Sequence, residues 1–363
     1  MRFVMCVWNE LADEREFEDT IPLEFIGRRL AALGERNRVE VLVLAGLERF
    51  SERYLDRLRE LGYRLHDGEA LTRELAAKIP LLVEHHRNWG GIKHFGYLRF
   101  LVLARLFAGE DIVAMDGDMV FNASFAEMET ALAGRLYFLG RSPCLGAIPA
   151  KSDFFAVYEE HMVRARVDRF HRLRRALRLP VSGRFDPVRT KTADQDLLRH
   201  IRRIGAIEFD SEPLLEGNLI GFYNWIAIGA LKLGPYVYER RKGRDYINGR
   251  KLLVSHIQHD AWVYFWQAML LAKLFGRENV PKFGRIPVLY PHYQQGPVNE
   301  PLRAFLARCH EAFATAHPAL PAGADFFSRG AVVKHYYEDG DLGEILNDRS
   351  WHTAGVFAER AGS

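Results

Sequence analysis

The sequence has little of several features that would assign a class of protein at once. Its 363 residues include only 3 cysteines, Cys6, Cys144 and Cys309, and no two of them are spaced as C-x-x-C. This number excludes a scaffold built on disulfides, and the spacing predicts neither a structural zinc site nor a dithiol redox site. No apolar stretch reaches the roughly 18 residues that a membrane-spanning helix needs.

An excess of charge of one sign is also nearly absent. The chain has 50 lysines and arginines against 47 aspartates and glutamates, a formal net charge of +3. So small an excess predicts no general affinity for nucleic acids. The first residues turn acidic after a short apolar run, which is not the pattern of a secretory signal peptide. With 48% hydrophobic residues, the composition predicts a cytoplasmic globular protein with a sizeable core.

The first third of the chain alternates apolar runs of strand length with helical patterns. Strands are predicted at Arg2–Trp8, Val39–Ala45 and Asp111–Met115. Helices are predicted at Ile26–Leu33, Ser51–Leu61 and Tyr97–Phe107. Strands that alternate with helices in this way predict βαβ units, and therefore an α/β fold around a mostly parallel sheet.

Later parts of the chain have other patterns. Residues 161–178 combine many arginines with apolar residues at helical spacing, which predicts a basic amphipathic helix. The simpler interpretation is a solvated helix face. The alternative is a peripheral contact with anionic headgroups at the inner membrane, or with a phosphorylated acceptor. Residues 263–363 are predicted to form a mainly helical and irregular extension, with helices at Ala261–Phe275 and Pro301–Ala316.

The most informative residues stand at the end of the third predicted strand, where the sequence runs into Asp116-Gly117-Asp118. Side chains two positions apart on an extended chain point the same way, so both carboxylates are expected to face one cleft. Gly117 is expected to let a ligand approach closely. Ligands of open α/β sheets bind outside the carboxyl ends of the strands, and two carboxylates there suit Mn²⁺ or Mg²⁺. The alternative is an ordinary Asp-Gly turn without function.

Arg99 interrupts the apolar stripe of the predicted helix Tyr97–Phe107, 17 residues before Asp116. A guanidinium beside strand-end carboxylates can bind a phosphate or orient an aspartate. The alternative is a surface arginine whose stem covers apolar neighbours.

Together these residues resemble the GT-A-fold glycosyltransferases. The closest pattern is that of the retaining family eight, which includes glycogenin and bacterial lipopolysaccharide galactosyltransferases. That family has a Tyr-x-Arg, here Tyr97-Leu98-Arg99, at about this distance before an Asp-x-Asp strand. The resemblance implies that Arg99 contacts a sugar-nucleotide donor, and that Asp116 and Asp118 hold Mn²⁺ on the nucleotide diphosphate.

The resemblance also implies a domain organisation. Residues 1–262 are expected to form a GT-A-like, Rossmann-like catalytic domain around a central, mostly parallel mixed sheet. Residues 1–120 would be its nucleotide-binding half and residues 121–262 its acceptor half. Trp8 and Asn9 end the first predicted strand, where family members contact the nucleoside, and a tryptophan there can stack on uracil.

Two later motifs extend the resemblance. Asp194-Gln195-Asp196 opens a predicted helix, as the family's Asp-Gln-Asp does. The resemblance implies that Asp194 contacts the donor sugar or the acceptor, and that Gln195 lies near the anomeric carbon; as a helix-opening residue, Asp194 is equally an N-cap. His256 follows a predicted strand where the family has a metal-binding histidine, in a His-x-x-Gly-x-x-Lys-Pro-Trp pattern. Here His259 replaces the glycine and the Lys-Pro pair is missing, so the family's diphosphate-binding lysine has no counterpart.

We therefore expect a metal-dependent glycosyltransferase. It would move a sugar from a nucleotide-diphosphate sugar, of the UDP class, to a hydroxyl of a saccharide or lipid-linked acceptor in bacterial surface polysaccharide or lipopolysaccharide synthesis. Mn²⁺, or Mg²⁺, on Asp116, Asp118 and His256 would neutralise charge on the leaving diphosphate, and Arg99 would add fixed positive charge.

Two alternatives remain open. The sequence around Asp116 also resembles the nucleophile strand of haloacid-dehalogenase-type phosphatases, in which Asp116 would be phosphorylated and Asp118 would be the acid/base. The other alternative is a non-catalytic nucleotide- or carbohydrate-binding protein on the same fold.

Overall fold

The computed structural model describes residues 1–11, 14, 17, 18, 21–85, 91–165, 177, 185, 193–212, 214, 215, 218–222, 238–241, 244–247 and 249–256. The chain divides into two compact units, Met1–Glu216 and Gly217–Ser363. Most of the predicted basic helix 161–178 lies outside the described residues. The predicted extension 263–363 and the helix predicted from Ala261 lie outside them as well.

The first unit contains a mixed sheet of six strands. These are β1 (Arg2–Val7), β2 (Val39–Val43), β3 (Arg64–Asp67), β4 (Ile112–Asp116), β6 (Tyr137–Phe138) and β7 (Leu145–Ile148). They lie in the order β3-β2-β1-β4-β7-β6. The first four in this order are mutually parallel, whereas β7 is antiparallel to both β4 and β6. The predicted α/β fold with a mostly parallel mixed sheet is thereby confirmed, and the arrangement is compatible with a Rossmann-like fold.

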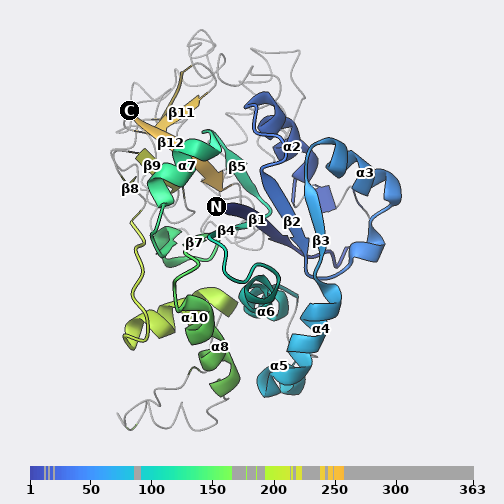
Figure 1. Cartoon of the computed structure of the whole chain (residues 1–363), viewed down its shortest axis with the longest axis vertical. Coiled ribbons are helices and arrows are strands. Elements are labelled where there is room, and N and C mark those ends of the chain that lie inside the picture. The colour runs from blue at the N-terminus through green and yellow to red at the C-terminus, as the bar shows by residue number, and fades with distance from the viewer. Residues whose placement is uncertain are drawn as a thin grey trace, which may run out of the picture. The chain divides into compact units, whose positions relative to one another are not determined.

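Helices cover both faces of this sheet (Figure 1). One face carries α4 (Glu69–Lys78), α5 (Pro80–His85), α6 (Gly91–Leu106), α8 (Phe154–Arg164) and α10 (Ala193–Arg203). The other carries α2 (Leu23–Ala32), α3 (Glu52–Glu60) and α7 (Phe125–Leu132). The remaining elements of this unit are β5 (Met119–Phe121), β8 (Leu214–Leu215) and the 3-10 turns η1 (Leu47–Arg49) and η3 (Leu139–Arg141).

The alternation along β1 shows how the sheet divides its side chains between the two layers. Val4 and Cys6 are buried in one cluster with the apolar residues of α6, α8 and α10. Phe3 points the other way and packs edge-on against Phe125 of α7, with 4.3 Å between ring centroids. Since β4 pairs in register with β1, Ile112 and Ala114 join the α6 cluster. The side chain two residues after Ala114 therefore points to the α6 layer as well.

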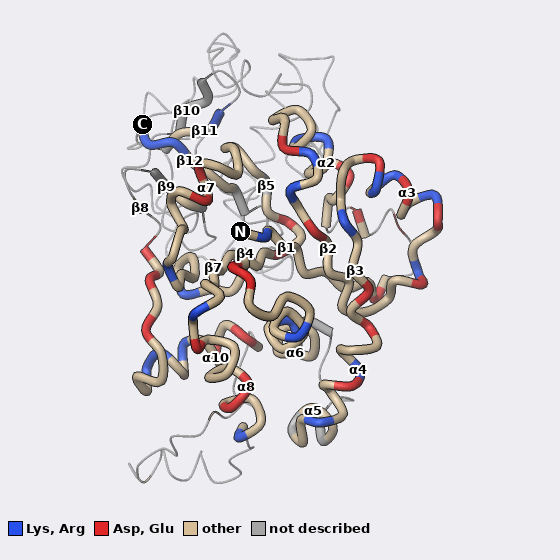
Figure 2. Tube along the Cα trace, in the orientation of Figure 1, with Lys and Arg blue, Asp and Glu red and all other residues tan. Residues whose placement is uncertain are grey.

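Local sequence signals account for helix starts. Ser51 caps α3, its side chain accepting a hydrogen bond from the Tyr54 N–H at 3.2 Å, as the sequence predicts. α7 begins with a reciprocal capping box between Ser124 and Glu127. Charged residues of both signs follow one another along α3, whose apolar residues Tyr54, Leu55 and Leu58 face the core (Figure 2).

The second unit contains β9 (Asn218–Phe222), β10 (Tyr238–Arg241), β11 (Arg244–Ile247) and β12 (Arg250–His256). They follow the order β10-β11-β12-β9, with β12 parallel to β9 and the other pairs antiparallel. Across the described parts of both units, no helix combines the length and apolarity that crossing a bilayer requires.

Candidate functional site

β4 places Asp116 at the carboxyl end of the parallel strands. Ala114 is buried against α6, so Asp116 projects from the same face of the strand toward that helix. Asp116 pairs in register with Cys6 on β1, and its N–H donates to the carbonyl oxygen of Cys144 at 2.9 Å. The backbone of Asp116 is thus fixed on both sides, while its side chain remains 30% exposed.

Asp118 does not continue the strand. Gly117 and Asp118 form a turn between β4 and β5, so the premise that an extended chain aligns the two carboxylates is wrong. Asp118 is half-buried, and its Oδ1 atom is shielded from solvent. The two aspartates therefore share the end of one strand, but a turn rather than a pleat decides how they are oriented.

Gly117 is required by close packing. A Cβ added there would lie 2.5 Å from Cγ2 of Ile21 and 2.7 Å from Cγ1 of Val7. A side chain at this position is excluded by Ile21, two residues before α2, and by Val7 at the end of β1. The space beside Gly117 is occupied by these two residues, and not left for a ligand as the sequence suggested.

The decisive feature is a buried arginine between two carboxylates. Arg99 lies on α6, is 4% exposed, and its Nη1 donates to Oδ1 of Asp116. Its Nε lies 2.5 Å from Oδ2 of Asp194 on α10. Three motifs far apart in the sequence thus meet at one point, so Arg99 orients aspartates, which is one of the two roles that the sequence suggested.

Burial controls the electrostatics of this cluster. Desolvation raises the pKa of Asp194 to about 6, although Arg99 opposes the shift. Burial alone would lower the pKa of Arg99, but Asp194 and Asp116 outweigh it and raise that pKa. Burial raises the pKa of the neighbouring Cys6 thiol to about 12, so this cysteine is a neutral core residue and not a nucleophile.

Asp194 and Gln195 lie in the first turn of α10. The helix begins at Ala193, so Asp194 is inside it and the N-cap alternative is wrong. Oδ1 of Asp194 accepts a hydrogen bond from the N–H of Gln195 at 2.9 Å, and both residues are 7% exposed. A carboxylate in the first helical turn is stabilised by the free N–H groups there.

Trp8 and Asn9 follow β1 at the same end of the sheet. The half-buried Trp8 ring packs against Phe95 of α6, with 5.7 Å between centroids. Asn9 is 2% exposed, and its Oδ1 accepts a hydrogen bond from the Leu11 N–H at 2.9 Å. Its Nδ2 has no hydrogen-bond partner among the described residues. Buried polar groups without a partner are uncommon in folded proteins, and a bound ligand or water is one explanation of such a group.

His256 is the last residue of β12, in the second unit, and its side chain lies outside the described part of the chain. Its role as a metal ligand stays a prediction. Within the part that the structure describes, no three His, Cys, Asp or Glu side chains are arranged to hold a metal ion. Two carboxylates remain, and hard divalent cations bound by one or two carboxylates usually complete their coordination with substrate phosphates and water.

The sequence interpretation missed Gly96, which lies one turn before Arg99 and faces Asp194. The signal for it was present, because a glycine inside a strongly apolar helix costs helix stability and usually has a packing reason.

No protein-family model matches the chain, and no curated protein matches its sequence. The site is therefore interpreted from its own residues and their geometry.

Proposed function

We propose that the protein is a metal-dependent glycosyltransferase of the GT-A type. It transfers a sugar from a nucleotide-diphosphate donor, of the UDP-sugar class, to a hydroxyl of a saccharide or lipid-linked acceptor. The observation that carries the proposal is the contact of Arg99 with both Asp116 and Asp194. The resemblance relates these three residues only by their order along the chain, and their meeting in space is an independent agreement with it.

The place of this cluster supports the proposal. It lies where β1 and β4 end, and ligands of open α/β sheets bind outside the carboxyl ends of the strands. The antiparallel β7 beside β4 makes the sheet mixed, as the proposed GT-A type requires. On the same side, Asn9 offers a buried amide donor suited to a carbonyl or ring acceptor of a nucleoside.

The charge of the cluster supports a cation as cofactor. In the contacts described, one arginine pairs with both Asp116 and Asp194, and Asp118 lies in the turn directly after β4, so three carboxylates stand close to one another in this part of the structure. Asp116 and Asp118 would hold Mn²⁺ or Mg²⁺, with His256 as the predicted third ligand. When bound, the metal would neutralise charge on the leaving diphosphate.

The contacts of Arg99 indicate a positioning role, beside the donor contact that the resemblance implies. The Arg99 guanidinium pairs with both carboxylates, and it therefore holds Asp116 and Asp194 beside α6. Direct binding of Arg99 to donor phosphate stays a prediction. Asp194 and Gln195, on the first turn of α10, would face the sugar.

The test is release of nucleoside diphosphate from a panel of nucleotide sugars, with Mn²⁺ and with a chelator. Wild type should hydrolyse one donor slowly and only with metal, and Asp118→Ala should abolish this. Asp56→Ala removes an aspartate whose side chain is 64% exposed on α3, and it should leave the rate unchanged. Absence of nucleotide binding by the wild type would overturn the proposal.

Two other outcomes distinguish the alternatives. Nucleotide binding without turnover, even with saccharide acceptors added, would favour a binding protein on this fold. Release of phosphate from a simple phosphomonoester, abolished by Asp116→Asn, would favour the phosphatase. The peripheral membrane contact through residues 161–178 stays a separate prediction, tested by salt-sensitive binding to anionic vesicles.

A further inference from the structure

Gly96 lies on α6, one turn before Arg99, at a point where α10 comes very close. A Cβ added to Gly96 would lie 3.1 Å from Cβ of Ala193, 3.5 Å from Oδ1 of Asp194 and 3.6 Å from its Cγ. The first of these distances is shorter than the optimal separation of two carbon atoms, so the neighbour would have to move by a few tenths of an ångström. The two helices therefore approach each other more closely here than a side chain at position 96 would allow.

This close approach and the ion pair occur on the same face of α6. Residues three apart on a helix are neighbours on its surface, so Gly96 and Arg99 both face the first turn of α10. Nε of Arg99 lies 2.5 Å from Oδ2 of Asp194, and the other oxygen of that carboxylate is the one nearest the Gly96 position. The close approach at Gly96 and the ion pair with Arg99 therefore involve the same carboxylate.

The rest of α10 is fixed in the core. Leu197, Leu198 and Ile201 belong to the buried cluster that includes α6 and α8. Because these residues hold the later turns, a side chain added at position 96 would displace mainly the first turn. That turn carries Ala193 and Asp194, so the displacement would fall on the ion pair with Arg99.

We infer that Gly96 is a positioning residue, whose missing side chain lets α10 place Asp194 against Arg99 and so keeps Arg99 and Asp116 in register with each other. The inference deepens the proposed transferase function and rests on it for the catalytic measurement. The packing on which it stands is independent of that function.

The effects of Gly96→Ala on stability and on turnover separate positioning from mere packing. Alanine favours a helix over glycine by about 1 kcal/mol, which offsets part of the cost of the displaced ion pair, so the denaturation midpoint should change little. Turnover of the donor should nevertheless fall about tenfold, because small misplacements of catalytic groups are costly. The loss should appear in kcat, with the donor KM changed by less than about threefold, since donor contacts made elsewhere are kept. Unchanged kcat would overturn the inference.

A second substitution tests the contact directly. Ala193→Gly removes the carbon that a side chain at position 96 would meet first. The double variant Gly96→Ala with Ala193→Gly should recover kcat to within about threefold of the wild type, as expected for coupled neighbours. Loss in the double variant equal to the sum of the two single losses would contradict the inference.

Gly27→Ala on α2 is the matched control. Its added Cβ would lie 2.9 Å from Cβ of Leu61 and 3.0 Å from Cε2 of Tyr63, a tighter contact than at Gly96. None of these residues contacts Arg99, Asp116 or Asp194 in the structure. This variant should have a lower denaturation midpoint with kcat unchanged, and a fall in kcat like that of Gly96→Ala would overturn the inference.

A stability measurement tests Gly96 without any activity. Arg99→Met should lower the urea midpoint in both the wild-type and the Gly96→Val background. In the second background the drop should be about half as large, because the contact with Asp194 is already lost. Equal drops would overturn the inference. If the wild type shows no metal-dependent turnover, the proposed function fails, and this measurement alone decides the role of Gly96.

Discussion

Two arginines, at opposite ends of the strands of the same sheet, each lie between two carboxylates. At the carboxyl ends of the strands, Arg99 contacts Asp116 and Asp194, and its side chain is 5% exposed. At the amino ends, Arg2 contacts Glu40, with Nη1 2.6 Å from Oε1, and also Glu110, and its side chain is 35% exposed.

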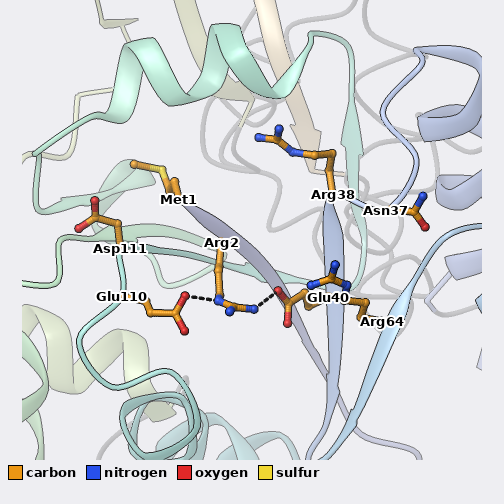
Figure 3. A pocket seen from close by; sticks show the side chains of 8 residues that line it. All are labelled: Met1, Arg2, Asn37, Arg38, Glu40, Arg64, Glu110 and Asp111. Carbon is orange, nitrogen blue, oxygen red and sulfur yellow. Dashed lines mark hydrogen bonds and ion pairs between the residues drawn. The ribbon is translucent and has the colours of Figure 1, made fainter.

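The amino-end group is an open surface network. It lines a cavity of about 390 Å³ bordered by the starts of β1, β2, β3 and β4 (Figure 3). Glu40 is also 2.6 Å from Nε2 of His66, so this carboxylate has two basic partners. The same pairing chemistry occurs at both ends of the strands, but the Arg99 side chain is buried whereas the Arg2 side chain is partly exposed. Buried ion pairs are costly to assemble and costly to break, whereas exposed ones contribute little. The proposed site lies at the end of the sheet where the arginine is buried.

The largest expected effect comes from Arg99→Met. It leaves Asp194 buried without its cation, so the free energy of unfolding should fall by about 3–5 kcal/mol. Urea denaturation at pH 7 measures it. If Arg99→Met lowered the free energy of unfolding no more than Arg2→Met does, burial would not distinguish the two ends of the strands.

The free energy of unfolding should depend on pH through Asp194, so wild type and Asp194→Asn should have different pH profiles. Burial raises its pKa to about 6, above the ordinary 3.8, so the folded protein holds a proton that the unfolded chain releases. The stability linked to this group is complete below pH 4 and is lost as the pH rises to about 6. Relative to Asp194→Asn, wild type should lose about 2–3 kcal/mol over that interval. Denaturation curves at several pH values measure this, with Asp196→Asn as control; parallel profiles of wild type and Asp194→Asn would contradict it.

A smaller effect is expected from Gly117→Ala. The added methyl group overlaps Ile21 and Val7, so unfolding should become easier by about 1–3 kcal/mol. The loss should be partly relieved when Ile21→Ala is combined with Gly117→Ala.

Gly109 stands before β4, at the amino end of the sheet, with open space around it and a φ of +78°. Its change to alanine should cost about 1 kcal/mol through backbone strain alone. Thermal denaturation of the three variants distinguishes overlap from strain, and an unrelieved double variant would exclude overlap.

The smallest change in the free energy of unfolding is expected at the amino ends of the strands. Arg2→Met should change the free energy of unfolding by less than about 1 kcal/mol, because its pairs are partly solvated. Even this difference should disappear in about 1 M salt, where the screening length is about 3 Å. A salt-independent loss in urea denaturation would mean that Arg2 is as firmly integrated as Arg99.

Much of the fold follows from local sequence signals. The strands β1, β2 and β4 lie within two residues of their predicted bounds, and Ser51 caps α3 as expected. The antiparallel β7 was not predicted, because its four residues, LGAI, are too few for a periodic pattern. The strand between Arg64 and Asp67 was missed for a related reason, since it is an edge strand with mainly polar residues.

The candidate site, like the fold, was predicted only in part from the sequence. The sequence by itself determined that Asp116 ends a buried strand and that Arg99 interrupts an apolar helix, because period and burial of a single element can be recognised in one stretch of chain. Only the tertiary structure decided that Asp194 meets Arg99, that Gly117 and Asp118 turn away from the strand, and that Gly96 faces α10. These contacts depend on how helices dock on a completed sheet, and docking is set by the packing of residues that are distant in sequence.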